Sequence, residues 1–178
     1  MNLQEQIIQK LTPYWEGEIH LKRNEFLATP GQKNTNMYFV TSGSLRVFIE
    51  DETEEHTIRF GYENSFTSAL DSFLKGTPTI FFIQALKNCS LKVISKATFL
   101  KFVNSTKENE KLWIQLLESF VYQQIEREND LIIYSPQKRF ERVFKRSPKL
   151  FQEIPQKYIA SYLRMTPETL SRILKSLD

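Results

Sequence analysis

The chain has 178 residues, of which 40% are hydrophobic and 25% are charged, and its formal net charge is +3. This balance is ordinary for a globular protein and allows one large or two small domains. A single cysteine, Cys89, excludes internal disulfides and multi-cysteine metal or iron–sulfur clusters. No apolar run approaches the roughly 18 residues of a membrane span, and residues 1–10 lack a signal-peptide layout. We therefore expect a cytoplasmic protein without a membrane partner.

The first two-fifths of the chain after a short helix has the pattern of β-strands. Residues 2–11 predict an amphipathic helix that ends before Pro13. From residue 19 to about residue 95 the apolar period changes to two. The expected strands are 19–21, 26–27, 37–40, 45–49, 57–60, 80–86 and 91–94, with the acidic run 51–55 as a hairpin tip. Many short strands separated by turn residues predict a β-barrel or jelly roll.

A long helix without Pro or Gly follows from about residue 108 to residue 134, after a short helix at 96–103. Side chains at three- and four-residue steps form a seam along it, namely Ile114, Leu117, Val121, Ile125, Glu128 and Ile132. A single small barrel cannot cover so long a seam, so we interpret it as a parallel, coiled-coil-like homodimer contact. The alternative is a helix that packs only on its own barrel. Ser135-Pro136 then marks a domain boundary.

The last 25 residues contain two short helical patterns separated by a tight break at Arg164-Met165. Thr166 is suited to cap the second helix, and Pro167 to its first position. The second helix has two opposite faces, an apolar stripe of Leu170, Ile173, Leu174 and Leu177 and a polar face of Glu168, Arg172 and Lys175. This is the pattern of a helix-turn-helix, although a helical hairpin that closes a small bundle has similar spacing.

The charge distribution favours DNA over the simple hairpin. Residues 135–178 hold ten Lys/Arg and four acidic residues, an excess of six positive charges, so residues 1–134 carry a net −3. Such an asymmetry suits a chain of which one end meets phosphates.

Two stretches resemble a known family. IPQKYIASYLRMTPETLSRILKSL (154–177) is similar to the C-terminal helix-turn-helix of the Crp/Fnr regulators, the cyclic-AMP receptor protein family. PGQ (30–32) and MYFVTSGSLRVFIE (37–50) resemble the sensor domain of the same family. One departure is Arg164, which stands where the family usually has Gly, at a cost of roughly 1 kcal/mol if the turn needs positive φ.

The resemblance implies an α+β fold with three parts. Residues 1–105 are expected to form a double-stranded β-helix, the jelly-roll sensor that resembles a cyclic-nucleotide-binding domain. Residues 106–134 are the dimerisation helix, and 135–178 a helix-turn-helix or winged helix-turn-helix domain. Any wing within this sequence has to come from residues 151–155 or be minimal. Double-stranded DNA, a second copy and RNA polymerase are the partners that the family implies.

The sensor departs from the cyclic-nucleotide pattern. By resemblance the ligand pocket would involve Phe60, Gly61, Glu63, Asn64, Ser65, Thr79, Ile80 and Phe81. Glu63 could take the ribose contact, but Thr79 and Ile80 stand where an Arg-Ser/Thr pair would bind the cyclic phosphate. Without that guanidinium a buried phosphate stays unpaired, so we do not expect cyclic-AMP binding of the usual kind. A different, unidentified effector or a solidly packed domain remain as alternatives.

Other chemistries have little support in the sequence. His20 and His56 are the only histidines, and neither belongs to a cluster of ligands, so we expect no metal, no haem and no cupin-type enzyme. No nucleophile and base converge as a catalytic set. Cys89 is interpreted as a buried structural thiol, with a redox switch as the weaker alternative.

The second helix of the pair would therefore enter the major groove. Arg172 is expected to bind guanine O6 and N7, and Glu168 to accept from a cytosine amino group, as equivalent residues do in the family. Pro167 replaces a base-reading Arg of some relatives, so the DNA site should differ from theirs. Thr166, Thr169, Ser171 and Lys175 are expected on phosphates. The competing hypothesis is a ligand-binding or protein-interaction module whose basic tail docks an acidic partner.

Overall fold

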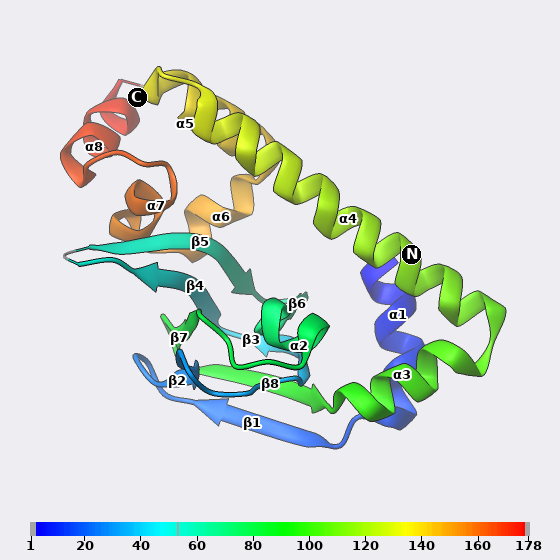
Figure 1. Ribbon diagram of the computed structural model, residues 1–178. Coiled ribbons are helices and arrows are strands. Elements are labelled where there is room, and N and C mark those ends of the chain that lie inside the picture. The colour runs from blue at the N-terminus through cyan, green and yellow to red at the C-terminus, as the bar shows by residue number, and fades with distance from the viewer. Residues whose placement is uncertain (1–2, 53, 177–178) are drawn as a thin grey trace.

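The computed structural model describes residues 3–52 and 54–176, so Leu177 of the predicted apolar stripe lies outside the described residues. The chain begins with α1 (Leu3–Leu11) and the 3-10 turn η1 (Thr12–Tyr14). Eight strands follow: β1 (Gly17–Leu21), β2 (Phe26–Ala28), β3 (Met37–Ser42), β4 (Ser44–Glu50), β5 (Glu55–Tyr62), β6 (Ser65–Thr67), β7 (Phe82–Ala85) and β8 (Cys89–Ile94). They form two antiparallel sheets of order β1-β8-β3-β6 and β2-β7-β4-β5, which confirms the predicted jelly roll (Figure 1).

Two elements of the sensor were not expected from the sequence. β6 has only three residues and pairs with β3, and the short helix α2 (Leu70–Lys75) follows it. Gly76 ends α2 in the left-handed conformation at φ 73°. Elements this short lack a recognisable period, because fewer than two repeats of the pattern fit within them.

The strand β4 is buried on both faces, whereas alternation predicts one exposed face. Leu45 and Val47 point into the barrel core, but Arg46 and Phe48 are only 4% and 1% exposed. The guanidinium of Arg46 lies between the rings of Phe48 and Tyr158, at 3.8 and 4.4 Å from their centroids. Tyr158 belongs to the C-terminal region, so that region covers the outer face of this sheet.

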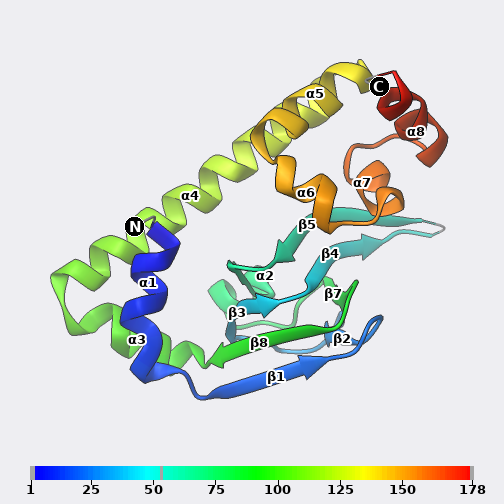
Figure 2. The ribbon, with the colours of Figure 1, turned by 180° about the vertical axis from the view of Figure 1, so that it is seen from behind.

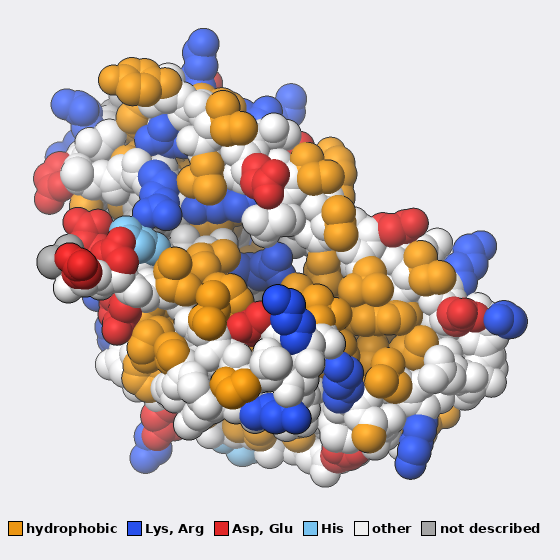
Figure 3. All heavy atoms as spheres, in the orientation of Figure 1, with side chains coloured by type: hydrophobic (Ala, Val, Ile, Leu, Met, Phe, Trp, Pro, Cys, Tyr) orange, Lys and Arg blue, Asp and Glu red, His pale blue; other side chains and the backbone are white. Residues whose placement is uncertain are grey.

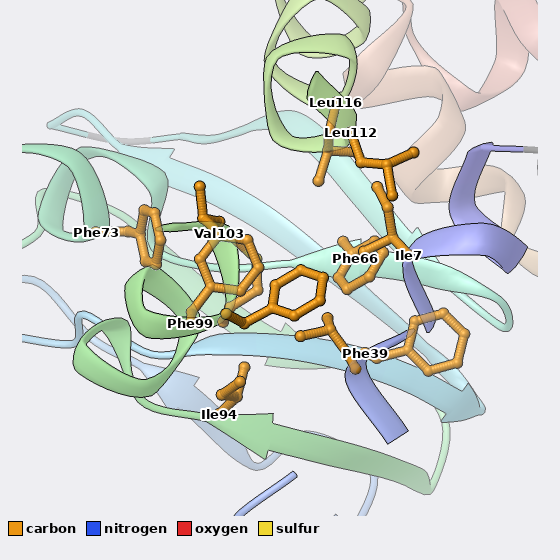
Figure 4. Close-up of a cluster of buried hydrophobic side chains, with 12 residues drawn as sticks. Ile7, Phe39, Phe66, Phe73, Ile94, Phe99, Val103, Leu112 and Leu116 are labelled. Carbon is orange, nitrogen blue, oxygen red and sulfur yellow. The ribbon is translucent and has the colours of Figure 1, made fainter. Parts of the chain in front are cut away.

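A second layer of apolar side chains lies between the barrel and its flanking helices (Figure 4). It joins α1, β3, β6, α2, β8, α3 (Lys96–Ser105) and the first turns of α4 (Lys107–Ile132). The buried members drawn in Figure 4 include Ile7, Phe39, Phe66, Phe73, Ile94, Phe99, Val103, Leu112 and Leu116. The start of the long helix is therefore part of the sensor core, which fixes the direction in which α4 leaves the barrel.

The long helix runs from the sensor to the C-terminal helices, as two opposite views show (Figures 1 and 2). Thr106 caps α4 by accepting a hydrogen bond from the Asn109 backbone N–H. After the break at Ser135-Pro136 the chain forms α5 (Pro136–Arg146), α6 (Pro148–Glu153), α7 (Gln156–Tyr162) and α8 (Pro167–Lys175). None of the helices within the described residues is long and apolar enough to cross a membrane.

Residues 151–155, which were considered for a wing from the sequence, do not form one. Residues 151–153 are the end of α6, and the described part of 135–176 contains helices and no strand. Pro148 starts α6 at a position where a helix tolerates the missing N–H, and Leu150 then packs into the C-terminal core.

Candidate nucleic-acid interface

The turn between α7 and α8 requires a left-handed residue, and Arg164 supplies it at φ 52°. Its backbone N–H donates to Ser161 O at 3.1 Å, and that of Met165 donates to Ala160 O at 3.0 Å. These bonds close the end of α7 in the manner of a left-handed helix cap. Arg164, which stands where the resembling family usually has Gly, is therefore accommodated without opening the turn.

The start of α8 is capped as its sequence predicts. The Thr166 hydroxyl oxygen accepts the Thr169 N–H at 3.2 Å, and Pro167 occupies the first turn. A hydrogen bond from its own backbone N–H, and a second from the Thr166 hydroxyl, lower the pKa of the Glu168 carboxyl. Glu168 is therefore an anion that can only accept hydrogen bonds near neutral pH.

The two faces of α8 separate as expected. Leu170 and Ile173 are buried in a cluster with α5, α6 and α7. The predicted DNA contacts lie on the other side: Thr166, Pro167, Glu168, Arg172 and Lys175 are exposed, and Thr169 and Ser171 are half-buried. Gln156, which the sequence did not single out, lines an open groove together with Pro167, Glu168, Ser171, Arg172 and Lys175. The structure thus brings most of the predicted residues to one free surface.

Arg139 holds the helix-turn-helix in place, a structural role that sequence reasoning missed. Its guanidinium is buried and donates to Ile133 O, Tyr134 O, Leu163 O and Arg164 O at 2.6–3.0 Å. It therefore ties the ends of α4 and α7 to α5. The sequence shows only another basic residue here, because the acceptors are backbone carbonyls from distant segments.

Part of the basic excess of residues 135–178 is neutralised inside the molecule. Arg142 and Arg146 form ion pairs with Glu126 and Asp130 of α4, and Asp130 is fully buried. Arg139 is internal as well. These three cations hold α5 against α4 and are not free for phosphates, so the charge available to DNA is smaller than the count suggests.

The residues predicted for the ligand pocket do not line one cavity. Thr79 is buried, and its hydroxyl donates to Asp71 Oδ1 at 2.8 Å, while Ile80 is 65% exposed. Gly61 lies in β5 and faces the Thr67 side chain of β6, and Glu63 lies exposed in the β5–β6 turn. Asp71 also accepts the Ile80 N–H, and these bonds fix the 76–81 loop in a way that turns Ile80 outward. Phe60, Asn64 and Ser65 line a junction between the sensor and the C-terminal helices.

The sensor does contain a cavity of about 400 Å³, and only Phe81 of the predicted set lines it. Its other walls are Val47, Ile58, Arg59, Ser68, Leu70, Asp71, Leu74 and Gln124. The half-buried Arg59 is the cation that sequence reasoning overlooked, because it precedes the segments that the family resemblance compares.

One face of α4 is apolar and exposed on the single chain. Ile114, Val121, Ile125 and Ile132 of the predicted seam are all exposed, as are Tyr122 and Leu131 beside them. A shallow groove on this face is lined by Ile114, Leu117, Glu118, Val121, Tyr122 and Ile125. The opposite face, with Leu112 and Leu116, packs on the sensor. Glu128 is exposed next to the apolar face.

The remaining candidate residues have structural partners. The Cys89 thiol is buried and donates to Ser44 O and Lys87 O, and burial raises its pKa, which makes it a poor nucleophile. His20 contacts Ser90, and His56 contacts Asp51 and Arg164. Within the described ranges no three His, Cys, Asp or Glu side chains form a cluster that could hold a metal ion.

The part of the chain that forms the eight strands matches a known protein family. The model of the cyclic nucleotide-binding domain matches residues 18–106. The chain belongs to the cyclic nucleotide-binding domain family. A search of curated proteins found no significant sequence match.

Solved structures extend the likeness beyond this domain. A CooA variant from Carboxydothermus hydrogenoformans superimposes with a TM-score of 0.73 at 19% identity, covering 90% of this chain and 75% of CooA. FixK2 from Bradyrhizobium japonicum gives 0.74 at 16% identity, with 90% and 83% covered. The catabolite activator protein of Thermus thermophilus gives 0.58 at 19% identity, with 97% and 82% covered. The resemblance to the Crp/Fnr fold is therefore confirmed over the sensor, the long helix and the C-terminal helices.

Proposed function

We propose that the chain is a sequence-specific, DNA-binding transcriptional regulator of the Crp/Fnr type. The observation that carries this proposal is the free face of α8, where Glu168, Arg172 and Lys175 lie opposite the buried Leu170 and Ile173. A capped helix with such a face fits the major groove, and a guanidinium there can bind guanine O6 and N7 together. Glu168 is suited to accept from cytosine, and Thr166, Thr169, Ser171 and Lys175 to contact phosphates.

The regulator is proposed to act as a homodimer. The exposed apolar face of α4 is the surface for the second copy, because large apolar patches left on a single chain commonly mark an interface. Two copies paired along α4 would present two α8 helices, and so read a near-palindromic site with half-sites about one helical turn apart. In this division residues 1–105 sense, 106–134 dimerise and 135–178 bind DNA, with RNA polymerase as a further partner.

The sensor is proposed not to bind cyclic AMP in the usual way. Thr79 is engaged with Asp71, and the exposed Ile80 cannot replace a guanidinium on the phosphate. A carboxylate at Asp71 also lines the sensor cavity, which disfavours a phosphodiester there. Any effector of this chain should therefore differ from cyclic AMP in chemistry or in place.

Selection of bound sites from a random duplex library, at near-physiological salt, tests the proposal. We expect wild type to enrich a near-palindromic motif. Arg172→Ala should lose preference at one base pair in each half-site, at a cost of roughly 1–3 kcal/mol per contact. Lys145→Ala is the matched control, since Lys145 is an exposed cation outside α8. Its loss should weaken binding to all DNA sequences alike.

The alternative function is a protein- or ligand-binding module with a basic tail. A basic patch alone would bind any duplex with a steep salt dependence and no preferred site. Enrichment of no motif by wild type, with and without added cell extract, would favour that module and contradict the regulator. A motif that appears only with extract would instead indicate a required effector.

A further inference from the structure

A cavity of about 350 Å³ lies where the sensor, α4 and the C-terminal helices meet. β5 and β6 contribute Arg59, Tyr62 and Ser65 to its wall, α4 contributes Gln123, and α7 contributes Tyr162. In the space-filling view, Lys or Arg side chains are visible in the hollow between α4 and the barrel (Figure 3). The volume is within the range of small-molecule sites.

The cavity is electrostatically one-sided. Among the described residues, its lining includes two guanidiniums, those of Arg59 and Arg146, and no carboxylate. Arg146 is already paired with Asp130 and Glu126 outside the cavity wall, at 2.5 and 3.2 Å. Arg59 is different: its backbone pairs with Val47 in the β4–β5 ladder, but no hydrogen bond or ion pair joins its guanidinium to another residue of 3–52 or 54–176.

The environment of Arg59 makes an anionic ligand favourable. Burial lowers the pKa of its guanidinium, although the group stays charged at neutral pH. The charge is compensated by the Tyr162 hydroxyl, which raises the pKa of the guanidinium, and by the ring of Phe120, 5.8 Å from the guanidinium carbon. A half-buried charge without a partner is costly, and an oxyanion can accept two parallel N–H bonds from it.

The rest of the wall indicates the body of such a ligand. Phe60, Phe120 and Tyr162 supply aromatic surface, and Gln123, Asn64 and Ser65 supply hydrogen-bonding groups. We propose that this junction cavity binds a small organic anion with an aromatic or apolar body and a carboxylate or phosphate head, with Arg59 as the anchor of the head group. The sensor cavity is the poorer site for an anion, because Asp71 shares its wall with Arg59.

The position of the cavity suggests a consequence for DNA binding, which rests on the proposed function. Tyr162 belongs to the first helix of the helix-turn-helix, and its ring contacts Phe60 of β5 and the guanidinium of Arg127 of α4. A ligand in the cavity would touch the sensor and α7 together, and so stabilise one arrangement of the two.

The test measures binding without DNA, so that it stands apart from the regulator proposal. Thermal unfolding and calorimetric titration would use phenyl phosphate and benzoate as probes, with phenol as the neutral analogue. We expect at least one anion, but not phenol, to raise the melting temperature of the full chain. Arg59→Gln should lower the affinity for that anion about tenfold or more. Arg23 is an exposed arginine elsewhere on the barrel, so Arg23→Gln should leave the affinity unchanged.

Two neighbouring glutamines distinguish the cavities, since Gln123 lines the junction cavity and Gln124 the sensor cavity. Gln123→Trp narrows the junction cavity and keeps Arg59, so it should lower the affinity for the anion. It provides a test even if Arg59→Gln fails to fold. Gln124→Trp should retain binding. The proposal is overturned if neither anion binds wild type, if Arg59→Gln binds as wild type does, or if Gln124→Trp loses as much affinity as Gln123→Trp.

Discussion

At the scale of single residues, the helix-turn-helix depends on two arginines with different roles. Arg139 donates to four backbone carbonyls and so satisfies helix ends that would otherwise lack partners. Arg164 occupies the left-handed position of the turn, where a glycine is free of strain. Its guanidinium also donates to His56 Nδ1 at 2.7 Å, which offers a reason for a long side chain at this place.

The backbone of the turn can be tested by substitution of Arg164. Arg164→Val and Arg164→Asn both remove the contact with His56, but only asparagine tolerates positive φ. We expect the valine variant to be less stable than the asparagine variant by about 1–2 kcal/mol, because a β-branched residue is strained there. Denaturant unfolding of both variants measures the difference. Equal stabilities would contradict a strained left-handed turn at residue 164.

At the scale of elements, α4 has two apolar faces with different partners. Leu112 and Leu116 pack into the sensor core, and the face with Val121 and Ile125 is open on the single chain. Acidic residues near its end, Glu126 and Asp130, bind the arginines of α5. One helix thus holds the sensor and the helix-turn-helix region, and still leaves an apolar face open for the proposed second copy.

Val121→Glu tests the proposed dimer. Val121 is 60% exposed in the single chain, so the substitution should not disturb its fold, but it places a charge in the centre of the apolar face. We expect a shift from dimer to monomer in analytical ultracentrifugation, with weaker binding to the selected DNA site. Gln115→Glu, which adds the same charge at an exposed position of α4 outside the groove, is the control. A dimeric Val121→Glu protein would rule out this face as the interface.

At the scale of the whole molecule, the first helix of the helix-turn-helix lies on the β4–β5 hairpin of the sensor (Figure 1). The Ser161 hydroxyl accepts the Thr57 N–H at 3.1 Å and donates to Glu55 O at 3.2 Å. Tyr158 stacks on Arg46, and Tyr162 packs on Phe60. A change of shape in the sensor can therefore reach the helices of the helix-turn-helix through direct contacts.

Ser161→Ala measures the strength of this contact. The Thr57 N–H would lose its acceptor in a half-buried place, at a cost of roughly 1–3 kcal/mol. We expect faster amide hydrogen exchange in β5 from residue 55 to 60, with the rest of the barrel unchanged. Ser119→Ala, which removes a hydroxyl bonded within α4, should leave β5 as it is. Unchanged exchange in the Ser161 variant would show that the two parts separate readily in solution.

The sequence by itself determined the jelly roll, the long helix, the break at Pro136 and the capped α8 with its free polar face. These features depend on local period, on turn residues and on caps, all of which are written in neighbouring residues. The same is true of the exposed apolar face of α4, because this apolar seam is longer than one small barrel can cover.

Only the tertiary structure decided which charges are free and where cavities lie. Arg139, Arg142 and Arg146 read as phosphate ligands in a charge count, yet their partners are backbone carbonyls and α4 carboxylates brought near by folding. Arg46 and Phe48 read as the solvent face of a strand, yet Tyr158 of α7 covers Arg46, and Arg46 and Phe82 cover Phe48. Arg59 lies between two cavities because folding brings it next to segments as distant in sequence as Tyr162, and no local pattern carries information over such a separation.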